Sequence, residues 1–112
     1  MKETNLKIIP LGGLGEVGRN MMLYEYDDTA IVVDCGTMFP ENDMLGIDCI
    51  IPDFQYLRSR KDKIRGVIIT HGHEDHIGAI SYFLSEFNAP VYGTPLTLGL
   101  IKVKLTRRGM IN

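Results

Sequence analysis

The segment THGHEDHIG, from Thr70 to Gly78, contains all three histidines of the chain together with two carboxylates. Clustered imidazoles repel one another when protonated, and their burial without a partner costs desolvation energy. A bound cation reverses that balance, because neutral imidazole nitrogens and a carboxylate are ligands that an ion such as Zn²⁺ prefers. The segment therefore predicts a metal site rather than a merely structural turn.

The residues on either side predict a strand before the segment and a helix after it. Residues Gly66–Thr70 form a β-type apolar run that leads directly into His71. Apolar residues then repeat at helical spacing, which predicts a helix of about three turns that stops before Pro90. These apolar residues are Ile77, Ile80, Phe83, Leu84 and Phe87.

The spacing within the segment suggests how its side chains are used. His71 and His73 are two residues apart in an extended turn, so both side chains can project to the same side and share one ion. Asp75 and His76 follow where the chain turns into the helix, and they can face a second ion close to the first. Glu74 is interpreted as a solvent-facing charge and is left out of the ligand set.

The remaining pattern predicts a mixed α/β protein in the order strand, hairpin, strand, helix, strand, helix. The residues between Gly36 and Asp53 are rich in Pro, Gly, Asn and Asp and are expected to form a loop. Further expected strands are Leu6–Leu11, Met21–Tyr26, Thr29–Asp34 and Val91–Gly93, with a hairpin turn at Asp27 and Asp28. Further expected helices are Phe54–Arg60 and Leu96–Leu105, the latter beginning near Thr94 and Pro95.

The pattern HxHxDH after a β-run resembles the signature of the metallo-β-lactamase superfamily. The resemblance implies the first half of an αββα sandwich, a mixed sheet with flanking helices that holds one or two metals at its edge. It implies that His71 and His73 ligate the first metal and that Asp75 and His76, also the catalytic candidates, ligate the second. Asp34, in the segment VVDCG, matches the earlier acidic motif of the superfamily and is expected to orient the site from behind the ligands.

Three longer segments narrow the resemblance to the ribonuclease J family of the β-CASP group. They are PLGGLGEVGRN at Pro10–Asn20, DCGTMFPENDMLGIDCIIPDFQYL at Asp34–Leu57 and PVYGTPLTLGLIKVKL at Pro90–Leu105. The resemblance implies a hydrolase with two Zn²⁺ per complete site, with Mn²⁺ or Mg²⁺ as alternatives. A metal-activated water would attack the phosphodiester, in 5′-to-3′ exonuclease and endonuclease reactions on RNA with a 5′-monophosphate.

The resemblance also carries expectations about the whole protein. Residues 1–112 would be the N-terminal part of a metallo-β-lactamase domain, apparently truncated and inactive alone, because the further ligands of the family would lie beyond Asn112. The enzyme is expected to be cytoplasmic and to form a homo-oligomer or a hetero-oligomer with a paralogue. No secretory signal or membrane-spanning run is recognised in the sequence.

Three other functions remain open at this point. Another hydrolase of the superfamily, such as a glyoxalase II-like thioesterase or a lactamase, would carry the same metal motif. A non-catalytic metal-binding or interaction module is a second alternative. A third is a dinucleotide site, because Gly13, Gly15 and Gly18 satisfy GxGxxG after a strand. This last reading is disfavoured because the residues after Asn20 leave no room for the helix that it needs, so the glycines are expected to shape the floor of the metal site.

The overall charge restricts any nucleic-acid surface to local patches, because the net charge is −2. Two basic groups are candidates, although an ordinary solvated surface explains either one: Lys102, Lys104, Arg107 and Arg108, and Arg58, Arg60, Lys61, Lys63 and Arg65. The cysteines, Cys35 and Cys49, lack CxxC spacing and are interpreted as small hydrophobes with free thiols. Glu41, Asp43 and Asp48 are interpreted as ordinary loop acids rather than as a Ca²⁺ site.

Overall fold

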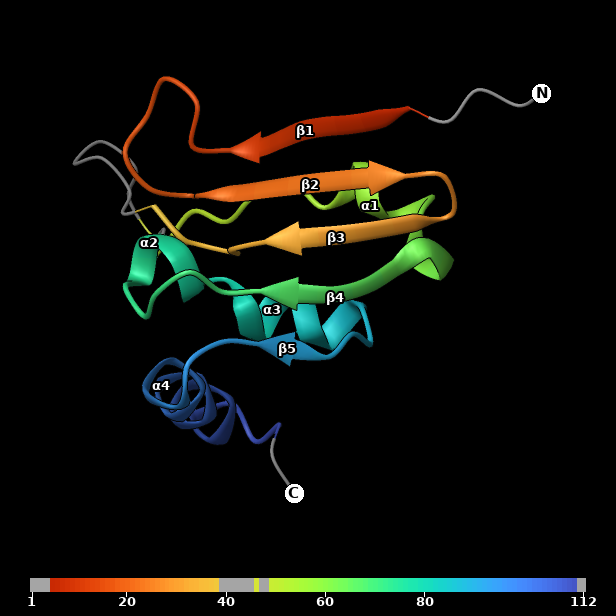
Figure 1. The fold of residues 1–112 in the computed structure, drawn as a ribbon. Coiled ribbons are helices and arrows are strands. Elements are labelled where there is room, and N and C mark those ends of the chain that lie inside the picture. The colour runs from red at the N-terminus through yellow and green to blue at the C-terminus, as the bar shows by residue number, and fades with distance from the viewer. Residues whose placement is uncertain (1–4, 39–45, 47–48, 111–112) are drawn as a thin grey trace.

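A computed structural model describes residues 5–38, 46 and 49–110 of the chain, and its named strands form one five-stranded sheet (Figure 1). The strands follow one another across the sheet in chain order. They are β1 (Leu6–Gly12), β2 (Met21–Tyr26), β3 (Thr29–Val33), β4 (Ile64–Ile68) and β5 (Val91–Tyr92). The pairs β1–β2 and β2–β3 are antiparallel, whereas β3–β4 and β4–β5 are parallel. The predicted mixed sheet is therefore confirmed.

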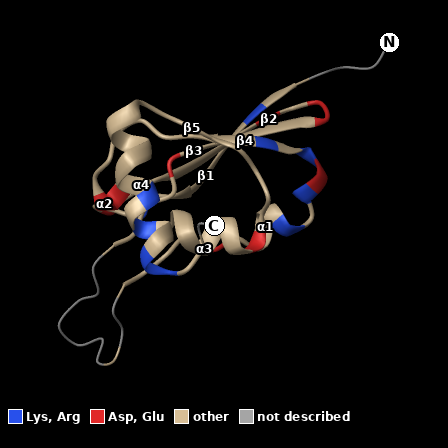
Figure 2. Cartoon of the chain, turned by 90° about the horizontal axis from the view of Figure 1, so that it is seen from below, with Lys and Arg blue, Asp and Glu red and all other residues tan. Residues whose placement is uncertain are grey.

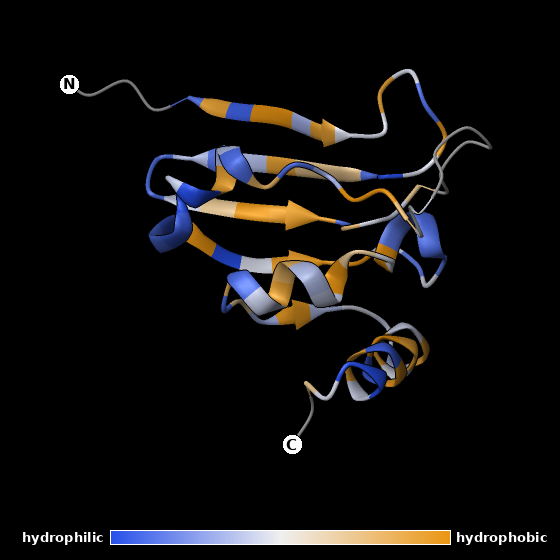
Figure 3. Ribbon diagram, turned by 180° about the vertical axis from the view of Figure 1, so that it is seen from behind, coloured by the Kyte–Doolittle hydropathy of each residue, from blue (hydrophilic) through white to orange (hydrophobic). Residues whose placement is uncertain are grey.

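The helices connect these strands, and α1 and α3 cover one face of the sheet. They are α1 (Gln55–Arg58), the 3₁₀ turn η1 (Lys61–Lys63), α2 (Glu74–Ile77), α3 (Ile80–Glu86) and α4 (Pro95–Arg107). Helices α1 and α3 lie behind the sheet in Figure 1, and Figure 3 shows α3 lying across the hydrophobic segments of the strands. Phe83 of α3 is fully buried and packs edge-on against Phe54, with ring centroids 5.8 Å apart. The core thus forms between this helix layer and one face of the sheet.

Alternation along the strands determines which side chains enter that core. In β2, Met21 and Leu23 are buried, whereas the intervening residues are more exposed, as expected when successive side chains point to opposite faces. The chain reverses at Asp27, whose φ of 54° lies in the left-handed region that Asp tolerates in turns. The predicted hairpin is confirmed by the antiparallel register from Met22–Val33 to Tyr26–Thr29.

A buried ion pair connects the helix layer to β2. The Arg60 guanidinium donates from Nε to Glu25 Oε2 at 2.7 Å and lies over the Tyr56 ring, 3.7 Å from its centroid. Glu25 is only 5% exposed, and Lys63 adds a second cation at 3.7 Å. Burial raises the pKa of the Glu25 carboxyl, but the hydrogen bond and charge of Arg60 and the charge of Lys63 outweigh burial and lower it.

The prediction of one three-turn helix after the histidine segment is wrong. The structure divides it into α2 and α3, separated by Gly78 and Ala79. The Ala79 N–H donates to the Cys35 carbonyl at 2.9 Å, and the Asp75 carbonyl accepts hydrogen bonds from Asn20 instead. In a continuous helix the Ala79 N–H would donate to the Asp75 carbonyl. Both groups are instead bonded to neighbouring segments, so α2 ends at the metal motif.

Other element boundaries differ from the expected ones by one or two residues. The fourth strand runs from Ile64 to Ile68 rather than from Gly66, and the third ends at Val33 because Asp34 adopts a φ of 63°. Helix α4 begins as predicted, with Thr94 as its N-cap and Pro95 in the first turn. The loop acids Glu41, Asp43 and Asp48 lie outside the described residues.

The second face of the sheet, toward the viewer in Figure 1, exposes large apolar side chains. Cross-strand pairing places Leu6 opposite Tyr26 and Ile68 opposite Tyr92 on this face. Their exposed fractions lie between 42% and 59%. Within residues 5–38, 46 and 49–110, no helix covers this face. Among the helices of those residues, none combines the length and the apolar character that a bilayer crossing requires.

Candidate metal centre

The histidine segment lies at the edge of the sheet where the parallel strands β3 and β4 both end. Asp34 directly follows β3. Thr70 and His71 lie in the short loop between β4 and α2. Figure 1 shows α2 at this edge. In open α/β sheets, ligands bind at the carboxyl ends of the strands, so the position fits a functional site.

Three side chains converge there on one small volume. One ligand atom each from His71, Asp75 and His76 lies within 4.8 Å of the others. The rings of His71 and His76 have centroids 3.9 Å apart, and His76 Nε2 is 3.5 Å from Asp75 Oδ2. Two imidazoles and a carboxylate are a donor set that a divalent ion such as Zn²⁺ accepts, so these residues fit a metal.

His73 lies beside this group without belonging to it. Its ring centroid is 4.7 Å from that of His71, and the residue forms the N-cap of α2 in extended conformation. Its carbonyl accepts hydrogen bonds from His76 and Ile77, which starts the helix. The structure therefore brings His71 together with Asp75 and His76, with His73 next to them; the division of the ligands between two ions stays a prediction.

Asp34 fixes the orientation of His76. Its carboxylate Oδ2 lies 2.7 Å from His76 Nδ1, and only 6% of the residue is exposed. An ionised carboxylate only accepts hydrogen bonds, so Nδ1 must carry a proton, and in the neutral imidazole Nε2 then presents its lone pair. Carboxylate partners of this kind orient metal-binding histidines in many proteins.

Thr70 connects the Asp34 carboxylate to His71 through hydrogen bonds. Its backbone N–H donates to Asp34 Oδ1 at 2.8 Å, and its hydroxyl Oγ1 donates to Oδ2 at 2.8 Å. The hydroxyl has one proton, so toward His71 Nδ1, 3.0 Å away, it acts as the acceptor. His71 therefore also carries its proton on Nδ1 and directs Nε2 outward. One buried carboxylate sets the tautomer of both histidines.

Asn20 forms hydrogen bonds with the backbone of Asp75. The Asn20 backbone N–H and side-chain Nδ2 both donate to the Asp75 carbonyl, at 3.1 and 2.9 Å. Gly36 lies against the same peptide: a Cβ added there would meet the Asp75 oxygen at 1.7 Å. Only glycine permits this approach, so the chain that follows β3 packs directly on the backbone of a candidate ligand.

The glycine-rich loop between β1 and β2 forms a wall of the site. Gly18 has a φ of 98°, and a Cβ there would lie 2.9 Å from the Thr37 carbonyl. Arg19 forms two hydrogen bonds with the Glu16 carboxylate, which together with a bond from the Gly13 backbone lower the pKa of that carboxyl. The loop leads into an antiparallel strand rather than a helix, which excludes the dinucleotide-binding alternative.

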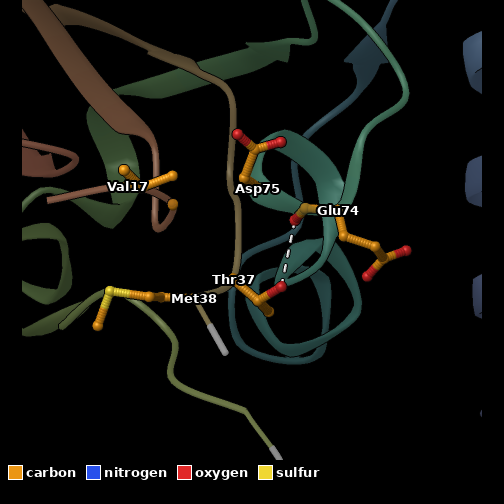
Figure 4. A pocket seen from close by; sticks show the side chains of 6 residues that line it. Val17, Thr37, Met38, Glu74 and Asp75 are labelled. Atoms are coloured by element: carbon orange, nitrogen blue, oxygen red, sulfur yellow. Dashed lines mark hydrogen bonds between the residues drawn. The ribbon is translucent and has the colours of Figure 1, made fainter. Parts of the chain in front are cut away.

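A cavity of about 320 Å³ separates this loop from α2 (Figure 4). Figure 4 shows Val17 and Met38 on one side and Glu74 and Asp75 on the other. The Thr37 hydroxyl donates to the Glu74 carbonyl at 3.2 Å and helps fix the start of α2. An apolar wall thus faces the carboxylate of Asp75 across a cavity that a substrate could enter.

Two predictions about residues near the site are confirmed. Both cysteines have free thiols, as predicted, and Cys35 is buried, whereas Cys49 was also expected to be buried and is only half-buried. Burial, and then the charge of Asp34, raise the pKa of the Cys35 thiol far above its usual range, so it stays protonated and does not act as a ligand. Glu74 is exposed and points away from the metal candidates to Lys104, whose Nζ lies 2.5 Å from Oε1.

Comparison with known proteins identifies the class. A profile of the metallo-β-lactamase superfamily matches residues 14–106, and the chain belongs to this superfamily. Among curated proteins, ribonuclease J of Helicobacter pylori (strain ATCC 700392 / 26695) is 55% identical over 108 residues, which cover 96% of this chain and 16% of that protein. Ribonuclease J 2 of Staphylococcus aureus (strain NCTC 8325 / PS 47) is 50% identical over 109 residues, which cover 97% of this chain and 20% of that protein. The chain thus spans about a fifth or less of these relatives.

Sequence reasoning assigned no role to Asn20 or Thr70. Both residues lie within the motifs described above. Asn20 follows Gly18 by two positions, and Thr70 directly precedes His71. Their roles depend on long-range contacts: Asn20 lies 55 positions from Asp75 in the sequence, and Thr70 lies 36 positions from Asp34. A polar residue directly before a candidate ligand, at a strand end, is the signal that could have indicated Thr70.

Proposed function

We propose that this chain carries part of the active site of a zinc-dependent ribonuclease that hydrolyses phosphodiester bonds of RNA with a 5′-monophosphate. The observation that carries the proposal is the convergence of His71, Asp75 and His76 at the ends of β3 and β4. The identity to ribonuclease J relatives supports RNA as the substrate. Exonuclease action from the 5′ end, together with endonuclease action, belongs to the same proposal.

In this proposal His71, His73, Asp75 and His76 hold the metal ions, and Asp34 orients two of the histidines. The mixed nitrogen and oxygen donors favour Zn²⁺, with Mn²⁺ or Mg²⁺ as alternatives. When bound, the ions supply Lewis acidity and an activated water. The chain itself supplies orientation: the hydrogen bonds of Asp34 and Thr70 occupy Nδ1 of both histidines, which leaves Nε2 as the nitrogen that would bind a metal.

The proposal extends to the domain that contains the chain. The apolar sheet face with Leu6, Tyr26, Ile68 and Tyr92 is, in our proposal, the surface against which the second sheet of the αββα sandwich packs. Two observations support this: side chains of this size are seldom left exposed together, and the matched residues make up only 16% and 20% of the two relatives. Oligomerisation with itself or a paralogue remains an expectation.

The test is a cleavage assay with the full-length protein on RNA that carries a 5′-monophosphate. Zinc-loaded protein should release mononucleotides from the 5′ end, and Asp75→Asn should remove the activity. Asp62→Asn, which changes an exposed carboxylate in η1, is the matched control and should leave the rate unchanged. Hydrolysis of a thioester or a β-lactam without cleavage of RNA would overturn the proposal in favour of another hydrolase of the superfamily. Metal binding without any hydrolysis would favour a non-catalytic module.

A further inference from the structure

The C-terminal end of α4, together with its C-cap residue Arg108, presents three cations on one face. Lys104, Arg107 and Arg108 are spaced at i, i+3 and i+4, which places their side chains side by side on a helix. In Figure 2 these basic segments of α4 lie next to the acidic segment of α2. One of the two basic groups noted in the sequence is therefore concentrated beside the metal motif, in contrast to the group near η1, which lies at the other end of the strands.

The three side chains line a groove of about 280 Å³ between α4, α2 and α3. Besides the cations, Ser81 and Tyr82 of α3 line the groove. The Arg108 guanidinium lies over the Tyr82 ring at 4.2 Å from its centroid, which holds it at the groove rather than in open solvent. The groove therefore holds positive charge at a fixed position.

The positive charge of the groove is only partly neutralised. Lys104 pairs with Glu74, whereas Arg107 and Arg108 have no carboxylate partner among residues 5–38, 46 and 49–110. Like charges at i, i+4 destabilise a helix slightly, so Lys104 and Arg108 repel each other. An anion in the groove would relieve this repulsion and could accept bidentate hydrogen bonds from the guanidinium groups.

The groove adjoins the cavity beside the metal candidates, and two residues, Thr37 and Glu74, line both. Glu74 lines the groove on one side and, on the other, the cavity that Asp75 borders. A chain molecule that reaches the metal ligands through that cavity would have to pass over the first turn of α2. The next position available to a phosphate on that path is the basic groove.

We infer that this groove binds the phosphodiester backbone of the RNA strand near the scissile position. The inference rests on the proposed function. The contacts are to phosphates and not to bases, so they position the strand without selecting its sequence. Within the groove Arg107 and Arg108 contribute the free charges, and Lys104 contributes the third cation when Glu74 is displaced from it.

The test is the salt dependence of RNA binding by the metal-loaded, full-length protein. The probe is a single-stranded oligoribonucleotide with a 5′-monophosphate and a non-hydrolysable backbone, followed by fluorescence anisotropy. In a double variant, Arg107→Gln with Arg108→Gln, the loss of two phosphate contacts should lower the slope of log K against log salt concentration by about 1.4, at about 0.7 for each contact. Lys102→Gln on the same helix, outside the groove lining, should leave the slope unchanged.

A second double variant, Arg107→Lys with Arg108→Lys, retains the charge and should retain the slope, which separates lost charge from lost structure. Inorganic phosphate as competitor distinguishes a site for a free anion from a site for a strand. Millimolar phosphate that displaces the RNA completely would overturn the inference. The inference is also overturned if the Gln double variant binds the oligoribonucleotide with the wild-type slope. Absence of RNA binding in the wild-type protein would instead overturn the proposed function.

Discussion

His76 Nδ1 lies 2.7 Å from Asp34 Oδ2, although 42 positions separate the two residues in the sequence. The contact is formed because β3 and β4 are adjacent and parallel, so the residues after each strand meet at one edge of the sheet. Asp34 reaches this point only by adopting a φ of 63° directly after β3. One carboxylate therefore connects the fold to the orientation of the candidate ligands.

Replacement of Asp34 by Asn should weaken metal binding about 10- to 100-fold. The amide has one acceptor oxygen and a donor in place of the second oxygen, so it cannot accept from both Thr70 and His76 as the carboxylate does. A competition titration with a zinc chelator measures the affinity. An affinity for Zn²⁺ equal to that of the wild-type protein would show that Asp34 does not orient the ligands.

Replacement of Asn20 by Ala should weaken metal binding by about five-fold, since one of the two hydrogen bonds to the Asp75 carbonyl is lost and the backbone N–H of residue 20 remains. Asn88→Ala, in the exposed turn before β5, is the matched control and should not change the affinity. The chelator titration applies here too. Equal loss in both variants would argue against a positioning role for Asn20.

Two glycine substitutions should have opposite effects. Gly36→Ala would place a Cβ 1.7 Å from the Asp75 carbonyl oxygen, so the protein should lose metal affinity and stability together. Gly99→Ala changes an exposed helical position with open space around it and should raise the free energy of unfolding by about 0.5 to 1 kcal/mol. Thermal unfolding followed by circular dichroism measures both. A Gly36→Ala protein as stable as wild type would contradict the packing described for the site.

The ion pair between Glu25 and Arg60 should make stability depend on pH. The pKa of Glu25 is lowered in the folded protein, so its contribution is complete above the ordinary value of 4.5 and is lost as pH falls through the lower folded value. Glu25→Gln should lower the free energy of unfolding near pH 7 by about 2 kcal/mol and flatten the acid limb. Asp28→Asn, in the exposed hairpin turn, should do neither. Urea unfolding between pH 3 and pH 7 makes the comparison.

Local patterns were sufficient to predict the strands, the hairpin and α4, because alternation, turn residues and a Thr-Pro cap act over a few positions. The histidine segment was recognised for the same reason. The break between α2 and α3 could not be predicted, since it depends on two long-range hydrogen bonds: the Ala79 N–H donates to the Cys35 carbonyl, and the Asn20 N–H donates to the Asp75 carbonyl. The apolar periodicity from Ile77 to Phe87 is compatible with one helix or two.

The grouping of the candidate metal ligands also depends on contacts that local sequence patterns do not predict. Spacing alone paired His71 with His73, which are close in sequence, and the structure places Asp75 and His76 against His71 as well. The connection of Asp34 through Thr70 to His71 requires knowledge of which strands are neighbours. Residue types were therefore predictable, and the contacts that give them roles were not.

The metal content of the purified, untagged, full-length protein tests the central claim most directly, because the claim is that these histidines and carboxylates are held together around divalent ions. Elemental analysis by mass spectrometry should find zinc bound in stoichiometric amounts to the wild-type protein and a loss of bound metal in His71→Ala, with Asp62→Asn unchanged. A folded wild-type protein without bound divalent metal, or a His71→Ala variant with the full wild-type content, would contradict the account.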